Sequence, residues 1–246
     1  MKFTKMQGIG NDYIYFNCFE ETIENPEELS RRLSDRRFGI GGDGICLIKP
    51  SDRADAFMDL YNADGSRAMM CGNGIRCVGK YVYERGICRR DVLKIDTLSG
   101  VKTLYLTVEN GIVTAVKVNM GAPILEPAKI PTTLPSNLKQ KIQANGTEYE
   151  VTAVSMGNPH SVIFTNEVDT LDLEKIGPAL ENHPVFPERV NTEFVQVLPT
   201  LRQHKTATVV AERPFARVLF IVWDKETGEV EMTGPAQFVF DGTVEI

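Results

Sequence analysis

The feature that most limits the possible folds of this chain is a weak internal repeat. The segment Gly10-Asn11-Asp12-Tyr13-Ile14 is echoed by Gly157-Asn158-Pro159-His160-Ser161-Val162. Each copy is followed by a helical segment and then by a strand, which we place at residues 37–48 in the first half and 190–197 in the second. Periodic organisation of this kind predicts two related halves that face one another.

A cysteine precedes a glycine-rich turn in the first half. Cys71 is followed by Gly72-Asn73-Gly74, and apolar residues at 75, 78 and 82 then have helical spacing, so we expect a helix from 71 to 84. The unpaired amides and partial positive charge of a helix N-terminus favour thiolate over thiol and can hold a carboxylate. Cys71 is therefore predicted to be a base or nucleophile beside an anion site; the alternative is a small buried apolar residue, the usual role of a free cysteine.

Composition excludes several classes of protein. The 246 residues are 42% hydrophobic and carry a net charge of -6, with no basic run that would suit nucleic acid. No apolar run is long enough for a membrane span, and the amino terminus has no secretory signal, so we expect a cytoplasmic protein. Five cysteines without a Cys-x-x-Cys pair argue against a disulfide framework and against a zinc or other metal site.

Local signals indicate a mixed α/β chain. Asn25-Pro26-Glu27-Glu28 is typical of a helix start, and we expect Arg36, Arg37 and Gly39 to close that helix. Asn110-Gly111 separates two segments with alternating apolar residues, 103–108 and 112–118, which predicts a β-hairpin. Asn145-Gly146 predicts a second hairpin in the same way.

Several motifs together resemble one family. The chain is similar to the diaminopimelate epimerases, which are cofactor-independent amino-acid epimerases of lysine and peptidoglycan-precursor synthesis. The matching motifs cover most of the chain in the family's order. They are Gly8-Ile-Gly10-Asn11-Asp12, Arg37-Phe-Gly-Ile-Gly41, Asn62-Ala-Asp-Gly-Ser66, Cys71-Gly-Asn-Gly74, Gly157-Asn-Pro-His160, Val190-Asn191-Thr192-Glu193-Phe194 and Met232-Thr-Gly-Pro235.

The resemblance implies an α/β (α+β) fold of two similar domains with a cleft between them. Each domain would be a curved mixed β-sheet wrapped around a central helix. The first would comprise residues 1–118 plus 235–246, because the final strand, 237–244, returns to it. The second would comprise residues 119–234.

The resemblance also implies a reaction and its residues. The family interconverts LL- and meso-diaminopimelate without a cofactor, by two cysteines that exchange α-protons on opposite faces of the substrate, and it often forms homodimers. Cys71 would be one acid/base, His160 would tune a catalytic thiol, and Glu212 would assist catalysis. The substrate would be held by Gly72 and Asn73 at its reacting end, and by Asn11, Asn62, Asn158, Asn191 and Arg213.

One part of the family pattern is missing. Family members continue from the Glu-Arg pair into a turn with the second cysteine and an alanine-rich helix. Here Pro214 follows Glu212-Arg213, which could instead belong to a later strand, and no cysteine occurs after Cys88. We therefore expect the second domain to lack its central helix. Two alternatives to the epimerase stay open: a catalytically silent protein that binds substrate or a partner, and a one-base isomerase or lyase.

Some site residues also have simpler interpretations. Asn11 and Asn158 suit turns that bind no ligand, because asparagine tolerates turn geometry. His160 could simply cap a strand. Gly41-Gly42-Asp43-Gly44 lacks the lysine and hydroxyl residue of a phosphate loop, so we interpret it as a tight turn beside the active cleft.

Overall fold

The structure is a computed structural model that describes residues 1–196 and 219–245. These residues form two compact units. Unit 1 comprises residues 1–120 with 219–220 and 231–245, and unit 2 comprises residues 121–196 with 221–230. Each unit is described below by itself.

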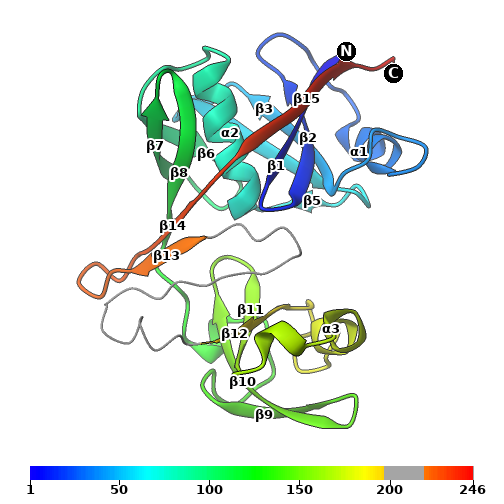
Figure 1. The fold of residues 1–246 in the computed structure, drawn as a ribbon, viewed down its shortest axis with the longest axis vertical. Coiled ribbons are helices and arrows are strands. Elements are labelled where there is room, and N and C mark those ends of the chain that lie inside the picture. The colour runs from blue at the N-terminus through cyan, green and yellow to red at the C-terminus, as the bar shows by residue number, and fades with distance from the viewer. Residues whose placement is uncertain (197–218, 246) are drawn as a thin grey trace. The chain divides into compact units, whose positions relative to one another are not determined.

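Unit 1 contains a long mixed sheet and two helices (Figure 1). The strand order is β14-β8-β7-β6-β4-β3-β2-β1-β15, and the short β5 pairs with β4. The elements are β1 (Lys2–Gly8), β2 (Asn11–Asn17), α1 (Pro26–Ser34), β3 (Gly44–Lys49), β4 (Ala56–Asn62), β5 (Arg67–Ala68), α2 (Gly72–Glu84), β6 (Val92–Asp96), β7 (Lys102–Glu109), β8 (Ile112–Gly121), β14 (Val230–Gly234) and β15 (Gln237–Thr243).

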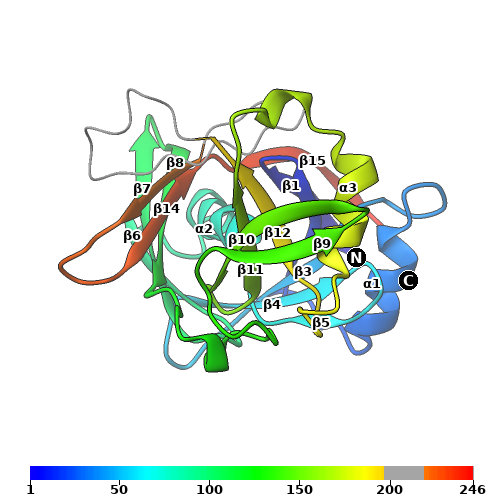
Figure 2. The same cartoon turned by 90° about the horizontal axis from the view of Figure 1, so that it is seen from below.

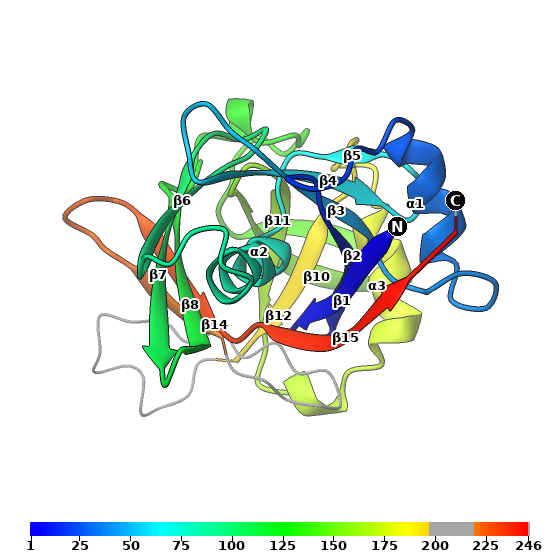
Figure 3. The same cartoon turned by 90° about the horizontal axis from the view of Figure 1, so that it is seen from above.

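The sheet of unit 1 wraps around α2. Figure 3 shows this helix along its axis, with β6, β7 and β8 on one side and β1 to β4 on the other. The helix buries Ile75, Cys77, Val78 and Val82 in an apolar cluster to which most of these strands contribute. A second cluster lies under α1, where Leu29 and Leu33 pack on residues of β2 and β3. The predicted mixed α/β class and the predicted central helix of the first domain are both confirmed.

Unit 2 is smaller and has a four-stranded sheet of order β12-β11-β10-β9. Figure 2 shows these strands side by side with α3 next to them. The core is formed by Ile142, Val151, Ile163 and Leu180, the last of which lies on α3. The elements are β9 (Gln140–Ala144), β10 (Thr147–Ser155), β11 (Pro159–Phe164), α3 (Leu173–Glu181) and β12 (Asn191–Val195), with short 3₁₀ turns at Pro127–Lys129 and Val168–Thr170; β13 (Phe220–Trp223) lies almost wholly in this unit.

The internal repeat corresponds to one repeated piece of topology. In unit 1, β2 is followed by α1 and pairs in parallel with β3, and Tyr13 lies opposite Gly44. In unit 2, β11 is followed by α3 and pairs in parallel with β12, and His160 lies opposite Asn191. Both pairs are 31 residues apart in the sequence. Within the described residues of unit 2, α3 therefore corresponds to α1, and no helix corresponds to α2.

The predicted hairpins are confirmed. Asn110 and Gly111 both have positive φ angles, 52° and 78°, and join β7 to β8. Asn145 and Gly146, at 51° and 77°, join β9 to β10 in the same way. Positive φ at both central residues is the geometry that an Asn-Gly turn supplies at little cost.

The helix α1 starts as predicted but ends earlier. It begins at Pro26, although the Asn25 side chain makes no capping hydrogen bond. It ends at Ser34 because the Asp35 carboxylate accepts hydrogen bonds from the backbone of Arg37 and Phe38, both at 2.7 Å, and turns the chain there. The prediction that Arg36, Arg37 and Gly39 close the helix was therefore wrong: these three residues belong to the loop that leads to β3.

Two further findings bear on the sequence predictions. The final strand, β15, pairs antiparallel with β1, so the end of the chain adds to the sheet of unit 1. No helix in the described ranges combines the length and the apolar character that crossing a membrane requires.

Candidate active site

Cys71 occupies the N-cap position of α2. Its backbone is extended, with φ −134° and ψ 119°, and its sulfur accepts a hydrogen bond from the Gly74 backbone amide at 3.3 Å. Its thiol in turn donates to Asn11 Oδ1, also at 3.3 Å. The side chain is partly buried. The sequence prediction of a thiol at the start of this helix is confirmed.

Two opposing influences act on the pKa of Cys71. Burial raises the pKa of its thiol above the ordinary value, although the amides of Gly74 and Asn73 and the charge of Arg76 all act to lower that pKa. The helix terminus therefore does act in the predicted direction, but the loss of hydration outweighs it. Burial thus opposes the predicted effect of the helix terminus and keeps the pKa of the Cys71 thiol above its ordinary value.

A chain of polar side chains leads away from Cys71. Asn11 Nδ2 donates to Asp43 Oδ2 at 2.7 Å, and the other oxygen of Asp43 lies 2.9 Å from Arg36 Nη2. Arg36 also reaches Asp12 at 2.7 Å, and Lys5 pairs with Asp12 at 2.8 Å. The Asn11 amide is thus a fixed part of the protein rather than a loose turn residue.

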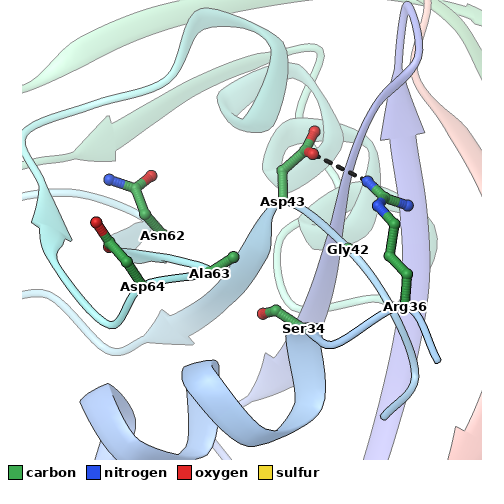
Figure 4. Close-up of a pocket in the computed structure, with 7 residues that line it drawn as sticks. All are labelled: Ser34, Arg36, Gly42, Asp43, Asn62, Ala63 and Asp64. Atoms are coloured by element: carbon green, nitrogen blue, oxygen red, sulfur yellow. Dashed lines mark hydrogen bonds and ion pairs between the residues drawn. The ribbon is translucent and has the colours of Figure 1, made fainter. Parts of the chain in front are cut away.

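An open hollow lies beside this network. Ser34, at the end of α1, lines it together with Arg36, Asp43 and Asn62 (Figure 4). Gly42, Ala63 and Asp64 complete the lining, and Cys71 is not among the lining residues. The hollow carries both signs of charge, which suits a ligand that is itself zwitterionic.

Asn62 is the last residue of β4, before the turn to β5. Its Nδ2 donates to Ser66 Oγ at 3.0 Å, and its Oδ1 lies 3.5 Å from the Tyr13 hydroxyl. The Ser30 hydroxyl donates to the Asn62 backbone carbonyl at 2.7 Å and so ties the turn to α1. In this structure the Asn62 amide faces groups of its own unit, at the edge of the hollow.

The first turn of α2 is held by a buried arginine. Arg76 has no exposed surface, and its guanidinium donates to Gly72 O at 3.1 Å, Asn73 Oδ1 at 2.8 Å and Pro235 O at 3.2 Å. Burial lowers the pKa of this arginine. The predicted substrate-binding residues Gly72 and Asn73 therefore lie together beside Cys71, with the Asn73 side chain engaged by Arg76.

The predicted residues of unit 2 also cluster. His160 Nδ1 lies 2.7 Å from Glu193 Oε1, and its Nε2 lies 3.0 Å from Asn158 Oδ1. Asn191 Nδ2 donates to the Pro159 carbonyl at 3.2 Å. The second carboxylate oxygen of Glu193 is buried without a hydrogen-bond partner. The structure thus brings together Asn158, His160 and Asn191, and adds a carboxylate that orients the imidazole.

Two predicted residues cannot be compared, and several residues were missed. Glu212 and Arg213 lie outside the described residues. The sequence alone offered no reason to assign a site role to Asp43, Arg36, Arg76 or Glu193, although each lies in one of the quoted motifs or within two residues of one. Across residues 1–196 and 219–245, no three His, Cys, Asp or Glu side chains gather as metal ligands would.

Comparison with known proteins decides the family. The family model described as diaminopimelate epimerase matches residues 3–126 and 152–239. The chain belongs to the diaminopimelate epimerase family. A diaminopimelate epimerase of Acetivibrio thermocellus is 47% identical, over 100% of this chain and 99% of that protein, and one of Phocaeicola vulgatus is 45% identical over 100% and 99%.

Solved structures with the same fold are more distant. A Bacillus anthracis phenazine biosynthesis protein of the PhzF family superposes with a TM-score of 0.67 at 14% identity, covering 100% of this chain and 99% of that one. A probable proline racemase from Agrobacterium radiobacter gives 0.68 at 13%, covering 100% and 93%. At these identities the likeness shows the fold alone.

The diaminopimelate epimerase relatives are longer than this chain. The alignment with the Acetivibrio thermocellus protein is 277 positions long, whereas this chain has 246 residues, which leaves about 31 positions of the relative without a counterpart here. The two stretches that match the family model are also unequal, since residues 3–126 are matched in the first half but only 152–239 in the second.

Proposed function

We propose that the chain is an amino-acid epimerase that interconverts LL- and meso-diaminopimelate in lysine biosynthesis. Full-length relatives that are 42–47% identical carry this name, and they favour it over a silent binding protein or a one-base isomerase. The observation that carries the proposal is Cys71. Its thiol caps α2 and is hydrogen-bonded to Asn11, in the motif by which the chain resembles the family.

Cys71 is the acid/base for one face of the substrate. The α-proton of an amino acid is very weakly acidic, so its removal requires the negative charge that develops at the carboxylate to be stabilised. The first amides of α2 and the buried charge of Arg76 suit that task. In one direction of the interconversion the Cys71 thiol donates a proton to the carbanion after another group has removed the α-proton from the opposite face, and in the reverse direction its thiolate removes that proton.

The ends of diaminopimelate are held by amides from both halves of the sequence. We assign Gly72 and Asn73 to the reacting carboxylate, and Asn11, Asn62, Asn158 and Asn191 to the amino-acid groups, with Arg213 gripping a carboxylate. Side-chain amides suit an amino acid because each offers a donor for the carboxylate and an acceptor for the ammonium group. His160 and Glu212 complete the catalytic residues.

The second acid/base is not a cysteine of the second half, because no cysteine follows Cys88 in the sequence. Inversion requires a proton donor or acceptor on each face, whichever residue supplies it. We assign His160, held by Glu193, a part in the proton transfer, since a carboxylate-oriented imidazole is a general acid/base.

The test is deuterium exchange at the α-carbon of LL-diaminopimelate in heavy water, with chiral detection of the meso product. Exchange with meso product, lost in Cys71→Ala, supports the epimerase. Exchange without inversion supports a one-base reaction, and binding of diaminopimelate without exchange supports the silent protein. Either of these last two results would overturn the proposal.

Further proposals concern the location of the protein and its partners. We propose that the protein is cytoplasmic and that it forms a homodimer, with diaminopimelate as its small-molecule partner and neither nucleic acid nor membrane as a partner. Light scattering after size exclusion, over a range of protein concentrations, tests the dimer.

A further inference from the structure

The amide of Asn11 lies between Cys71 and Asp43. Its Nδ2 is 2.7 Å from Asp43 Oδ2, and its Oδ1 is 3.3 Å from Cys71 Sγ. An ionised carboxylate can only accept hydrogen bonds, whereas an amide has one donating end and one accepting end. Because the donating end must face Asp43, the accepting end is left to face the thiol.

Asp43 is itself held in place from several directions. The Arg36 guanidinium contacts its Oδ1 at 2.9 Å, and the backbone amide of Asp12 donates to its Oδ2 at 3.1 Å. Its backbone amide donates to Asp12 O at 2.7 Å, and its carbonyl accepts from the Ala63 amide at 2.9 Å. Asp43 therefore joins the start of β2 to the turn after β4, and its carboxylate has a fixed position.

We propose that Asp43 is a positioning residue which, through the orientation of the Asn11 amide, keeps the Cys71 thiol protonated and ready to deliver its proton. An acceptor aimed at the S–H stabilises the thiol, and a donor in the same place would stabilise the thiolate instead. The inference rests on the proposed function only in assigning proton transfer to Cys71.

Other groups of unit 1 also act on Cys71. The charge of Arg76 and the amides of Gly74 and Asn73 favour the thiolate, while the negative charge of Asp43 favours the thiol directly. Four further groups interact with Cys71 electrostatically, and burial raises the pKa of each, which leaves them uncharged at neutral pH: Tyr13, Tyr15, Cys46 and Cys77. The charge of Asp43 and its hold on Asn11 thus act in the same direction and must be separated by experiment.

The test is the pH dependence of iodoacetamide alkylation at Cys71, resolved from the other cysteines by peptide mass spectrometry. Asp43→Asn removes the charge and lets the Asn11 amide turn its donating end toward the sulfur. We expect the alkylation midpoint to fall by about 0.5 to 1 pH unit. The assay needs the free protein and no turnover, so a failed epimerase assay would leave it unaffected.

A double-mutant cycle with Asn11→Ala separates orientation from charge. If Asp43 acts through Asn11, the shift caused by Asp43→Asn falls to less than half its size when Asn11 is absent. A shift of equal size in both backgrounds means that charge alone is responsible, and it overturns the proposal. An unchanged alkylation midpoint in Asp43→Asn also overturns the proposal.

Asp59→Asn is the matched control. Asp59 is a buried carboxylate of the same sheet, paired with Lys49 at 2.5 Å and Arg67 at 2.6 Å, and among the described residues its hydrogen bonds and ion pairs involve neither Asn11 nor Cys71. We expect it to lower stability while leaving the Cys71 midpoint in place; a shift equal to that of Asp43→Asn would count against the proposal. If Asp43→Asn does not fold, Asp43→Ser gives the same comparison.

Discussion

Arg76 and Asn73 are joined by a 2.8 Å hydrogen bond in which the guanidinium donates to the side-chain carbonyl of the amide. The arginine is 0% exposed, and its other oxygen acceptors are the neutral backbone carbonyls of Gly72 and Pro235. Burying a charged side chain away from water is costly unless its donors are satisfied. A buried cation maintained beside a thiol and a helix N-terminus therefore indicates that this end of α2 is built to receive negative charge.

Replacement of Arg76 should affect both stability and the Cys71 thiol. In Arg76→Met the three oxygen acceptors lose this donor, and a buried acceptor left unsatisfied costs about 1–3 kcal/mol, with less expected for partly buried acceptors such as these. The loss is partly offset because no charge is buried. We expect a lower urea midpoint and a Cys71 alkylation midpoint at higher pH, since Arg76 lowers that pKa.

Lys80→Met provides the comparison for Arg76. Lys80 is also buried on α2, but its ammonium is paired with Glu84 at 2.6 Å. This variant should lose stability and leave the Cys71 alkylation midpoint unchanged. Equal shifts in the two variants would mean that Arg76 has no specific electrostatic role.

Cys71 has a structural role and a chemical role that two substitutions can separate. Its sulfur caps α2 by accepting from Gly74 at 3.3 Å. Serine is a preferred N-cap, so Cys71→Ser should fold as stably as the parent, whereas Cys71→Ala should lose about 1 kcal/mol. Both should lower the epimerisation rate by roughly 10²- to 10⁴-fold, the usual contribution of an acid/base group. Thermal melts and the exchange assay measure the two effects, and an active serine variant would contradict the role of the thiol.

Turns and helix starts that are determined by adjacent residues could be predicted from the sequence. The Asn110-Gly111 and Asn145-Gly146 turns and the start of α2 were predicted correctly because the residues that determine them are adjacent. The end of α1 was placed too late, because the Asp35 turn competes with further helix.

The contacts between site residues could not be predicted in this way. Asn11 and Asp43 are 32 residues apart in sequence, and His160 and Glu193 are 33 apart. In each case the two residues lie on or beside two parallel strands that a helix connects. Which residues of such strands lie opposite one another depends on the register of the finished sheet. The effect of burial on the pKa of Cys71 could not be predicted either, since burial is a property of the folded chain.

The Glu193 carboxylate should affect the activity by orienting the His160 imidazole and by its negative charge. Its carboxylate lies 2.7 Å from Nδ1, so Glu193→Gln keeps an acceptor but removes the charge. Charge-assisted hydrogen bonds are worth about 1.5–3 kcal/mol, so we expect kcat/KM to fall about 10- to 100-fold with the fold intact.

Thr192→Val tests whether any change in β12 has the same effect as the loss of Glu193. The Thr192 hydroxyl is buried without a hydrogen-bond partner, so its removal should leave activity unchanged and stability equal or higher. Comparable losses of kcat/KM in both variants would show that the strand is merely sensitive to substitution.

Asp12 should make unit 1 sensitive to acid. Burial alone would raise the pKa of this carboxyl, but its hydrogen bonds and ion pairs with Arg36 and Lys5 outweigh burial, so the pKa lies below 3.8. A carboxyl whose pKa is depressed by folding stabilises the protein above its unfolded-state pKa, and that stability is lost as the pH falls through the folded-state value. The contribution is thus fully present at pH 6 and declines below about pH 4. In Asp12→Asn the free energy of unfolding should be lower at pH 6 and should fall less steeply between pH 5 and pH 3.

Urea unfolding at a series of pH values measures the effect of Asp12→Asn, with Asp91→Asn as the control. Asp91 is exposed, and its side chain forms no ion pair within the described part of the chain, so its replacement should leave the pH dependence unchanged. If Asp12→Asn retained the parent's loss of stability between pH 5 and pH 3, the acid sensitivity would have to arise from other carboxylates. The Lys5–Asp12–Arg36 group would then be a scaffold for Asn11 and Asp43 without a titrating role.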